Sequence, residues 1–314
     1  MKNILVVLCG GTIGCENNKN ILSPNSVSCK KIIEIYKKKF KDTNFFEVIN
    51  PLSVLSENMG KVEWKIIFET VKENILKYDG IIVTHGSDTL SYTANIAGLV
   101  FSNAEIPIVF TASNKELTDK TANGLVNFKN AVRFIETSNE KGVFVSYSNN
   151  LSDNTVFHAN NICEASNFDD SFSAYDREIY GKIINDKFVR LSNKNYTEKT
   201  NFEVDLSFKN DVLLIKPYPS MNYGDFNLEN VKAVVHYLYH SSTACVNGDG
   251  TSILKFIDRC DEKNIKVYLA PFKIESKNIY SSLEEILKKK NVKMLYDCSI
   301  EKAYATALVS INRR

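Results

Sequence analysis

The chain has 314 residues, of which 44% are hydrophobic, and its basic and acidic residues nearly balance to leave a formal net charge of +2. A chain of this length exceeds the size at which one hydrophobic core usually stops growing, so we expect two domains. The balanced charge gives no indication of a nucleic-acid partner, and there is no basic stripe interleaved with aromatic residues.

The chain contains seven cysteines, an odd number, and none of them forms a CxxC pair. This pattern favours reduced thiols in a reducing compartment, so we expect a cytoplasmic protein. Structural zinc sites usually draw on paired cysteines, and we therefore predict neither a metal nor a cofactor.

The N-terminus begins with a short apolar run, Ile4–Leu8, that leads straight into Gly10 and Gly11. The run is too short for the hydrophobic region of a signal peptide, and a buried strand fits it better. No stretch of the sequence approaches the roughly 18 apolar residues of a membrane span, so we expect no membrane partner.

Short apolar runs alternate with amphipathic stretches through the first half of the chain. The runs lack the polar alternation of a one-sided sheet, which favours parallel strands covered on both faces. The predicted strands are 4–9, 80–84, 106–111 and 142–147, and the predicted helices are 28–40, 61–77, 88–103 and 123–137. Residues 1–181 are therefore predicted to form a larger α/β domain with a mostly parallel sheet flanked by helices.

Residues 182–212 differ in composition, being rich in Lys, Asn and Thr, and they predict a surface hairpin and linker. Residues 213–314 then predict a smaller C-terminal α/β domain. Its expected strands are 212–215, 233–238, 265–269 and 293–296, and its expected helices are about 249–262, 279–290 and 299–312.

Two predicted strands run directly into polar, glycine-containing turns, and ligands of open parallel sheets bind beyond the carboxyl ends of strands. In the first turn, Gly10 and Gly11 permit positive φ and would deliver the hydroxyl of Thr12 to the sheet edge. A plain glycine turn with one polar residue explains the spacing equally well. A dinucleotide or Walker-type phosphate loop is a weaker interpretation, because neither spacing is matched.

The second turn contains Ser87 and Asp88 just before a predicted helix, near its positive N-terminal end. The Ser87 hydroxyl is suited to hold or activate water or substrate, and the Asp88 carboxylate is suited to receive an ammonium group. Ser and Asp are also preferred helix N-caps, which is a purely structural explanation. Together, the two hydroxyl-bearing turns indicate attack on an electrophilic carbon by an activated hydroxyl.

The two turns resemble the signature segments of bacterial-type L-asparaginases. Gly10–Gly14 is similar to the family's GGTI[AG] segment, and Thr84–Leu90 is similar to its HGTDT[ML] segment. Further similar pieces occur at Ser56–Met59, Ser91–Ala94, Thr111–Ser113, 123–132, Tyr239–Thr243 and Ser299–Tyr304. The resemblance covers nearly the whole chain and is most specific in the first 135 residues.

The resemblance implies that Thr12 attacks the side-chain amide of L-asparagine to form an acyl-enzyme, which water then hydrolyses to aspartate after ammonia has left. Ser87 stands where the family has a second catalytic Thr, and Asp88 completes the predicted catalytic set. The residues implied to bind the substrate are Gly11, Ser56, Glu57, Gly86 and Ser113. The resemblance also implies a homodimer or homotetramer.

Three positions depart from the family pattern. No lysine occurs from Val143 to Gly181, where the family has a catalytic Lys; His158 is the nearest titratable candidate, although a structural histidine is the favoured interpretation. The segment 16–28 lacks the family's loop Tyr, and Asn123 replaces a helix-start Asp. Two alternatives therefore stay open, a binding or regulatory protein with this fold and an amidase for another small amide.

Overall fold

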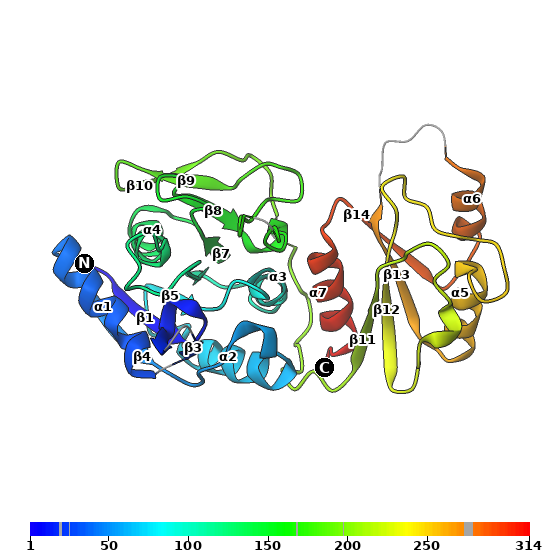
Figure 1. The fold of residues 1–314 in the computed structure, drawn as a ribbon, viewed down its shortest axis with the longest axis horizontal. Coiled ribbons are helices and arrows are strands. Elements are labelled where there is room, and N and C mark those ends of the chain that lie inside the picture. The colour runs from blue at the N-terminus through cyan, green and yellow to red at the C-terminus, as the bar shows by residue number, and fades with distance from the viewer. Residues whose placement is uncertain (19–20, 25, 168, 197, 273–278) are drawn as a thin grey trace. The chain divides into compact units, whose positions relative to one another are not determined.

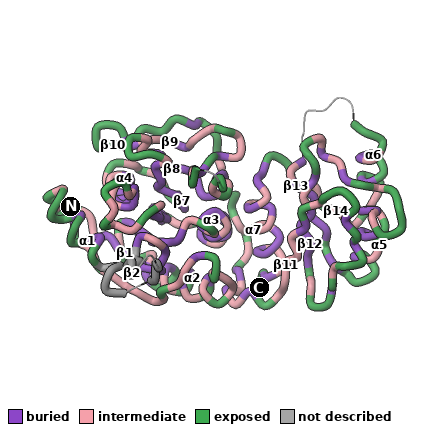
Figure 2. The backbone as a smooth tube through the Cα atoms, in the orientation of Figure 1, coloured by how far each residue is buried: buried purple, intermediate pink, exposed green. Residues whose placement is uncertain are grey.

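The structure is a computed structural model that describes residues 1–18, 21–24, 26–167, 169–196, 198–272 and 279–314; side chains within 14–30 are not described. The chain divides into two compact units, Met1–Asn201 and Phe202–Arg314 (Figure 1). Each unit is built on its own sheet. Figure 2 shows that buried positions follow the strands of both units, whereas the connecting loops are largely exposed.

The first unit contains an eight-stranded sheet in its described part. In spatial order its strands are β10 (Lys187–Arg190), β9 (Gly181–Ile184), β8 (Thr155–His158), β7 (Gly142–Ser146), β6 (Pro107–Thr111), β5 (Gly80–Thr84), β1 (Asn3–Leu8) and β4 (Phe45–Ile49). The strands from β7 to β4 are parallel, and β8, β9 and β10 continue the sheet in antiparallel pairs. A separate antiparallel pair joins β2 (Cys15–Asn18) and β3 (Ile21–Pro24).

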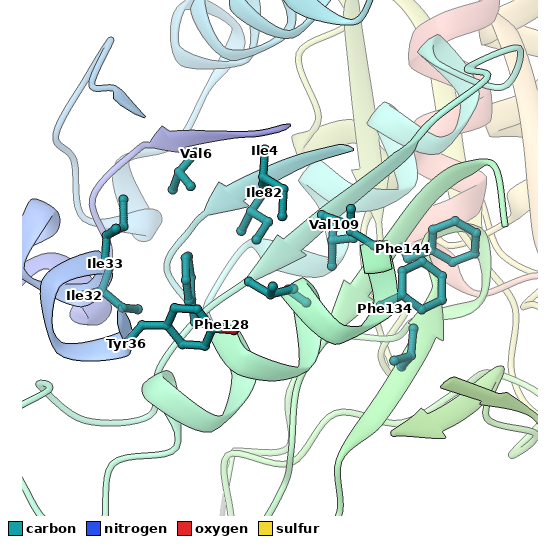
Figure 3. Packing of buried hydrophobic residues seen from close by; sticks show 14 of the residues in the cluster. Ile4, Val6, Ile32, Ile33, Tyr36, Ile82, Val109, Phe128, Phe134 and Phe144 are labelled. Carbon is teal, nitrogen blue, oxygen red and sulfur yellow. The ribbon is translucent and has the colours of Figure 1, made fainter. Parts of the chain in front are cut away.

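Helices cover both faces of this sheet. The helices α1 (Ser26–Phe40) and α4 (Gly124–Thr137) pack on one face, against alternate strand residues that include Ile4, Val6 and Ile82 (Figure 3). The other face carries α2 (Lys61–Asn74) and α3 (Leu90–Val100), which are joined by a hydrogen bond from the Trp64 indole to the Thr93 hydroxyl. Because both faces are buried, the strand residues between these positions are apolar as well.

The second unit has a four-stranded sheet in the order β11 (Asp211–Ile215), β12 (Val231–Tyr237), β13 (Lys266–Phe272) and β14 (Val292–Tyr296). All neighbouring strands in it are parallel. The core on one face includes side chains of α5 (Ile253–Glu262) and α6 (Ser281–Leu287), and α7 (Ile300–Ile311) packs on the other face.

The predicted fold class is confirmed. Apart from β4, the parallel strands and the helices between them occur where the apolar runs and amphipathic stretches predicted them, with ends shifted by a few residues. The apolar pattern did not predict β4, an edge strand whose Phe45 side chain is exposed and whose burial alternates. Among the described residues, no helix is both long and apolar enough to cross a membrane.

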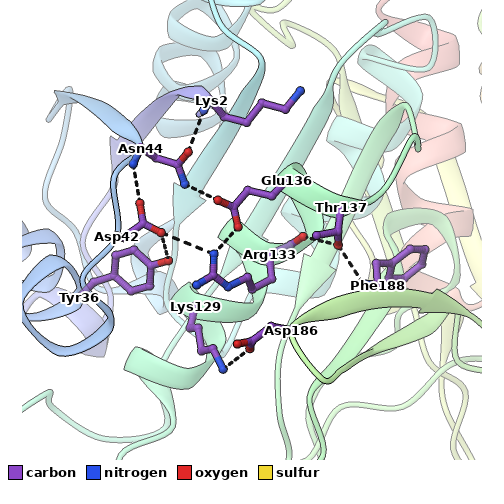
Figure 4. Close-up of polar contacts among 10 residues, drawn as sticks. All are labelled: Lys2, Tyr36, Asp42, Asn44, Lys129, Arg133, Glu136, Thr137, Asp186 and Phe188. Carbon is purple, nitrogen blue, oxygen red and sulfur yellow. Dashed lines mark hydrogen bonds and ion pairs between the residues drawn. The ribbon is translucent and has the colours of Figure 1, made fainter.

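A buried polar network ties α1, the loop before β4 and α4 together (Figure 4). The side chain of Asp42 is 2% exposed; it accepts hydrogen bonds from the Tyr36 hydroxyl at 2.6 Å and the Asn44 backbone N–H at 2.7 Å. The Arg133 guanidinium lies 3.7 Å from the same carboxylate and also pairs with Glu136. Burial and the bond to Asp42 raise the pKa of Tyr36, so its hydroxyl remains a donor.

We predict that Asp42→Ala lowers the free energy of unfolding by about 2–3 kcal/mol, because it leaves buried donors without an acceptor. Urea denaturation would measure the change. The matched control is Glu69→Ala, which removes a half-exposed ion pair with Lys65 on α2 and should cost at most about 0.5 kcal/mol. Equal losses in the two variants would contradict the prediction.

Candidate active site

The two polar turns follow adjacent strands at the carboxyl edge of the larger sheet. β1 and β5 pair in parallel up to Leu8 and Thr84, so the residues after them leave the sheet side by side. The chain order of the parallel strands reverses at this pair, since β4 lies beyond β1 and β6 lies beyond β5. Ligands of doubly wound sheets bind at such a switch point, which makes this edge the candidate site.

The first turn is held against its neighbours by two glycines with positive φ. Gly10, at φ +94°, lies against the backbone of Val54, and Gly11, at φ +73°, donates its N–H to the Val54 carbonyl at 3.0 Å. A Cβ on Gly11 would lie 2.4 Å from the Gly86 nitrogen, so only glycine permits this approach. The half-buried Thr12 follows, at the start of a short 3-10 helix over Thr12–Gly14.

The second turn is hydrogen-bonded to Ser56, which lies in the short 3-10 helix Ser56–Asn58. The Ser56 hydroxyl donates to the Asp88 carboxylate at 3.0 Å and lies 3.2 Å from the Asp88 backbone N–H, from which it accepts. The Thr89 hydroxyl donates to the Ser56 carbonyl at 2.8 Å. Asp88 is exposed and Ser87 is half-buried. Ser56 therefore orients the Asp88 carboxylate on one side, and the other side of the carboxylate is open to solvent.

The two further predicted residues differ in exposure. Glu57 is exposed next to Ser56. Ser113 follows β6 and is buried, and its hydroxyl donates to the Lys115 carbonyl at 2.5 Å. Asn123 closes the loop after Ser113 by exchanging side-chain-to-backbone hydrogen bonds with Asn114 at 2.9 and 3.0 Å. The side-chain amide of Asn123 therefore holds the two ends of this loop together.

His85 is fully buried within the second turn, and its backbone lies against Gly11. Its Nδ1 lies 2.8 Å from the Gly86 carbonyl, and its ring packs edge-on against Phe110. Burial lowers the pKa of His85 to about 4, which keeps the imidazole neutral near pH 7. A neutral Nδ1–H can then donate to the carbonyl, so His85 is suited to hold the turn in place.

The segment after β8 runs alongside α3 towards the site. Asn160 lies against Gly98, where a Cβ would meet its Oδ1 at 2.3 Å. The Asn95 amide then donates to the Ile162 carbonyl at 3.1 Å and to the Ser91 carbonyl at 2.8 Å. The segment thus passes from the end of α3 towards its first turn, just after Ser87. Cys163 and Glu164 come next in the chain, within the range 143–181 in which the family's lysine was expected and none occurs.

The structure places His158 away from this edge. It is 5% exposed on β8 and pairs across the sheet with Phe144, in the middle of β7. Its ring lies among those of Phe144, Tyr180 and Tyr196, with centroids 5.4–5.6 Å apart. This environment is that of a core histidine. The segment 16–28, which lacks the expected Tyr, includes residues outside the described part, and its side chains are not described.

The first unit contains the part of the chain that matches a known protein family. A family model described as "Asparaginase, N-terminal" matches residues 3–196, a span that is more than half of the chain and contains both turns. The chain belongs to the asparaginase family. Among the described residues of this family member, no group of His, Cys, Asp and Glu side chains is arranged to hold a metal ion.

Curated relatives match parts of the chain. L-asparaginase 1 of Escherichia coli is 30% identical over 135 residues, which cover 42% of this chain and 39% of the relative. A glutamyl-tRNA(Gln) amidotransferase component of Methanococcus maripaludis is 25% identical over 254 residues, or 75% of this chain and 58% of that protein. The matched regions therefore span less than two thirds of these relatives' lengths.

Solved structures match nearly the whole chain. The thermostable L-asparaginase from Thermococcus kodakarensis superimposes with a TM-score of 0.81 at 18% identity, covering 99% of this chain and 93% of that one. L-asparaginase I from Vibrio cholerae gives a TM-score of 0.76 at 20% identity, with coverages of 99% and 93%. At these identities the likeness establishes a shared fold.

We predict that Gly11→Ala disrupts the contact between the two turns, because its Cβ would overlap the backbone of His85 and Gly86. The matched control is Gly142→Ala; Gly142 also has positive φ, +107°, but a Cβ there would meet no atom within 4 Å. The control should lose about 1 kcal/mol of stability from backbone strain, and Gly11→Ala clearly more. Thermal unfolding of both variants measures this; equal shifts in Tm would refute the steric explanation.

Stability of the first unit should fall as the pH falls from about 6.5 towards 4. The pKa of His85 is lower in the folded protein than in an unfolded chain, so the unfolded chain binds the proton first. The difference in unfolding free energy between pH 7 and pH 5 should be smaller in His85→Gln than in the wild type by roughly 2 kcal/mol. Urea denaturation at the two pH values would measure it, and unchanged pH dependence in the variant would contradict it.

Proposed function

We propose that the protein is an amidohydrolase that cleaves the C–N bond of a small amino-acid amide, with L-asparagine as the leading substrate. The observation that carries this proposal is the direct backbone contact between Gly11 and Gly86, which brings the turns of Thr12 and Ser87–Asp88 together. Two hydroxyls and a carboxylate at one sheet edge suit nucleophilic attack on a ligand with an amino-acid head group.

In the proposed mechanism, the Thr12 oxygen attacks the amide carbon and forms a tetrahedral intermediate. Backbone N–H groups at the second turn, near the N-terminus of α3, would stabilise the negative oxygen. The intermediate collapses as the C–N bond breaks, and the leaving amide nitrogen takes up the proton given up by the Thr12 hydroxyl, so that it departs as ammonia. Water, held by Ser87, then attacks the ester, releases the acid and restores the Thr12 hydroxyl.

The head group of the substrate would be held by Asp88 with its neighbours. Asp88 is oriented by the Ser56 hydroxyl, so its free oxygen is available to the substrate ammonium. Glu57 is exposed beside it and supplies a second acceptor. Gly11, Gly86 and Ser113 line the same edge. Ser56 acts in this proposal by positioning the carboxylate as well as by contacting substrate.

A different amide substrate is the second candidate. It is favoured by the similarity to the glutamyl-tRNA(Gln) amidotransferase component over 75% of the chain, because that relative is named for a different reaction. A panel of L-asparagine, L-glutamine and N-substituted asparagines separates the two candidates. Ammonia release that is faster with asparagine than with the other amides supports the leading substrate.

The resemblance also leads us to propose a homodimer or homotetramer that acts in the cytoplasm. One solved structure with the same fold is described as a probable cytoplasmic L-asparaginase from Campylobacter jejuni. Light scattering of the purified protein would determine the number of subunits.

Thr12→Ala is predicted to lower the rate of ammonia release from L-asparagine on the order of 10³-fold or more, because the nucleophile is lost. The control is Thr43→Ala, which removes an exposed threonine before β4 and should leave the rate unchanged. Full activity in Thr12→Ala would overturn the assignment of the nucleophile. Ser87→Ala should also be severely impaired, whereas Ser87→Thr, which keeps the hydroxyl, should remain active.

A further inference from the structure

A small cavity opens at the carboxyl edge of the second sheet, between the loops that follow β11 and β12. Its volume is about 120 Å³, and its lining includes Tyr218, Met221, Tyr223, Tyr239, Cys245 and Thr251. In an open parallel sheet, this edge is where ligands bind. All of its lining residues belong to the second unit, whereas Thr12 belongs to the first.

The buried side of the cavity is formed by Tyr223 and is uncharged. The Tyr223 ring stacks on Phe256 with centroids 4.6 Å apart, and its hydroxyl lies 2.7 Å from Nε2 of His236. Burial lowers the pKa of His236 to about 4, so this histidine is neutral near pH 7. Burial also raises the pKa of Tyr223, which keeps the phenol protonated. The hydrogen bond between Tyr223 and His236 therefore holds the Tyr223 ring in place, and neither residue carries a charge next to the cavity.

The loops that line the cavity, one after β11 and one before α5, are joined by hydrogen bonds and close packing. The Tyr223 N–H donates to the Gly250 carbonyl at 2.7 Å, and a Cβ on Gly250 would lie 2.5 Å from Oδ1 of Asn222. The Thr251 hydroxyl donates to the Asn247 carbonyl at 2.6 Å. These contacts join the loop before α5 to the loop after β11, so the walls are fixed in place before any ligand arrives.

The lining has a consistent chemistry. None of the described residues that line the cavity carries a charge, and most of the surface consists of aromatic rings, prolines, a thioether and a thiol. A charged ligand would lose its hydration here without gaining an opposite charge. The tyrosine and threonine hydroxyls can still meet one polar atom at the rim. The volume of about 120 Å³ is somewhat smaller than the roughly 150 Å³ of an enclosed apolar cavity that accepts benzene, so a single ring would enter with one edge left at the exposed mouth.

We propose that this cavity is a binding site for a small uncharged molecule that inserts one aromatic ring or a branched aliphatic group of similar size. A zwitterionic amino acid does not fit this chemistry, so the site is distinct in specificity from the amide site of the first unit. The occupant contacts the rings of Tyr223 and Tyr239 and covers the thiol of Cys245.

Cys245 provides a direct test, because it is an exposed free thiol in the cavity lining. The full-length protein is alkylated with iodoacetamide in the presence of increasing benzyl alcohol, and the rate at each cysteine is read by peptide mass spectrometry. Modification of Cys245 should slow saturably, by roughly sixfold when the probe is at five times its dissociation constant. The partly exposed Cys163 in the first unit is the internal reference and should be unaffected by benzyl alcohol.

Charged probes of similar shape test whether the cavity prefers uncharged molecules. Benzoate, benzylammonium and L-aspartate should protect Cys245 at least about tenfold more weakly than benzyl alcohol, because the cavity offers them no counter-charge. Capped phenylalanine amide is included to distinguish a ring carried on a peptide from a free molecule; protection by either one supports the site. Equal protection by charged and uncharged probes, no protection, or equal slowing at Cys163 would overturn the proposal.

A pair of variants tests the wall of the cavity. Tyr239→Ala removes one ring from the lining and should abolish most of the protection by benzyl alcohol. The matched control is Tyr280→Ala, which removes an exposed tyrosine of the same unit outside the cavity lining and should leave protection intact. Undiminished protection in Tyr239→Ala would contradict the proposal. If that variant does not fold, the charged-probe comparison on the wild type still decides it.

Discussion

The candidate active site depends on the contact between the backbones of Gly11 and Gly86. A single Cβ at Gly11 would overlap the peptide between His85 and Gly86, so the two turns approach only because Gly11 lacks a side chain. A Cβ at Gly86 would lie 2.4 Å from the Ser56 hydroxyl, so that glycine is needed for the contact with Ser56. The approach sets the spacing between Thr12 and Ser87. Ser56 and His85 then fix the second turn, one through the Asp88 carboxylate and the other through the Gly86 carbonyl.

Much of the fold could be predicted because its strands are buried on both faces and therefore appear as continuous apolar runs. β4 could not, since an edge strand with an exposed Phe45 lacks that pattern. The turns after β1 and β5 were found from their glycines and hydroxyls. The Asn95 bond to the Ile162 carbonyl could not be found, because the two residues are 67 positions apart and an asparagine in a helix gives no signal of its partner.

The two units present different side chains at the same edge of their parallel sheets. In the first unit the edge carries glycines, hydroxyls and the Asp88 carboxylate, which suit a polar, charged head group. In the second unit it carries rings and sulfur around Tyr223, with the neutral His236 beneath. The edge fixes where a ligand can bind, and the side chains after each strand decide which ligand it is.

The position of β1 between β4 and β5 also has a consequence for how the protein folds. Thr12 and Ser87 are separated by more than seventy residues of chain, which include α1, β4 and α2. They meet only after β5 has docked beside β1, so the site arises from non-local pairing, which forms slowly. A ligand at this edge would therefore stabilise the central sheet as a cooperative whole, and partially folded chains would have no affinity for it.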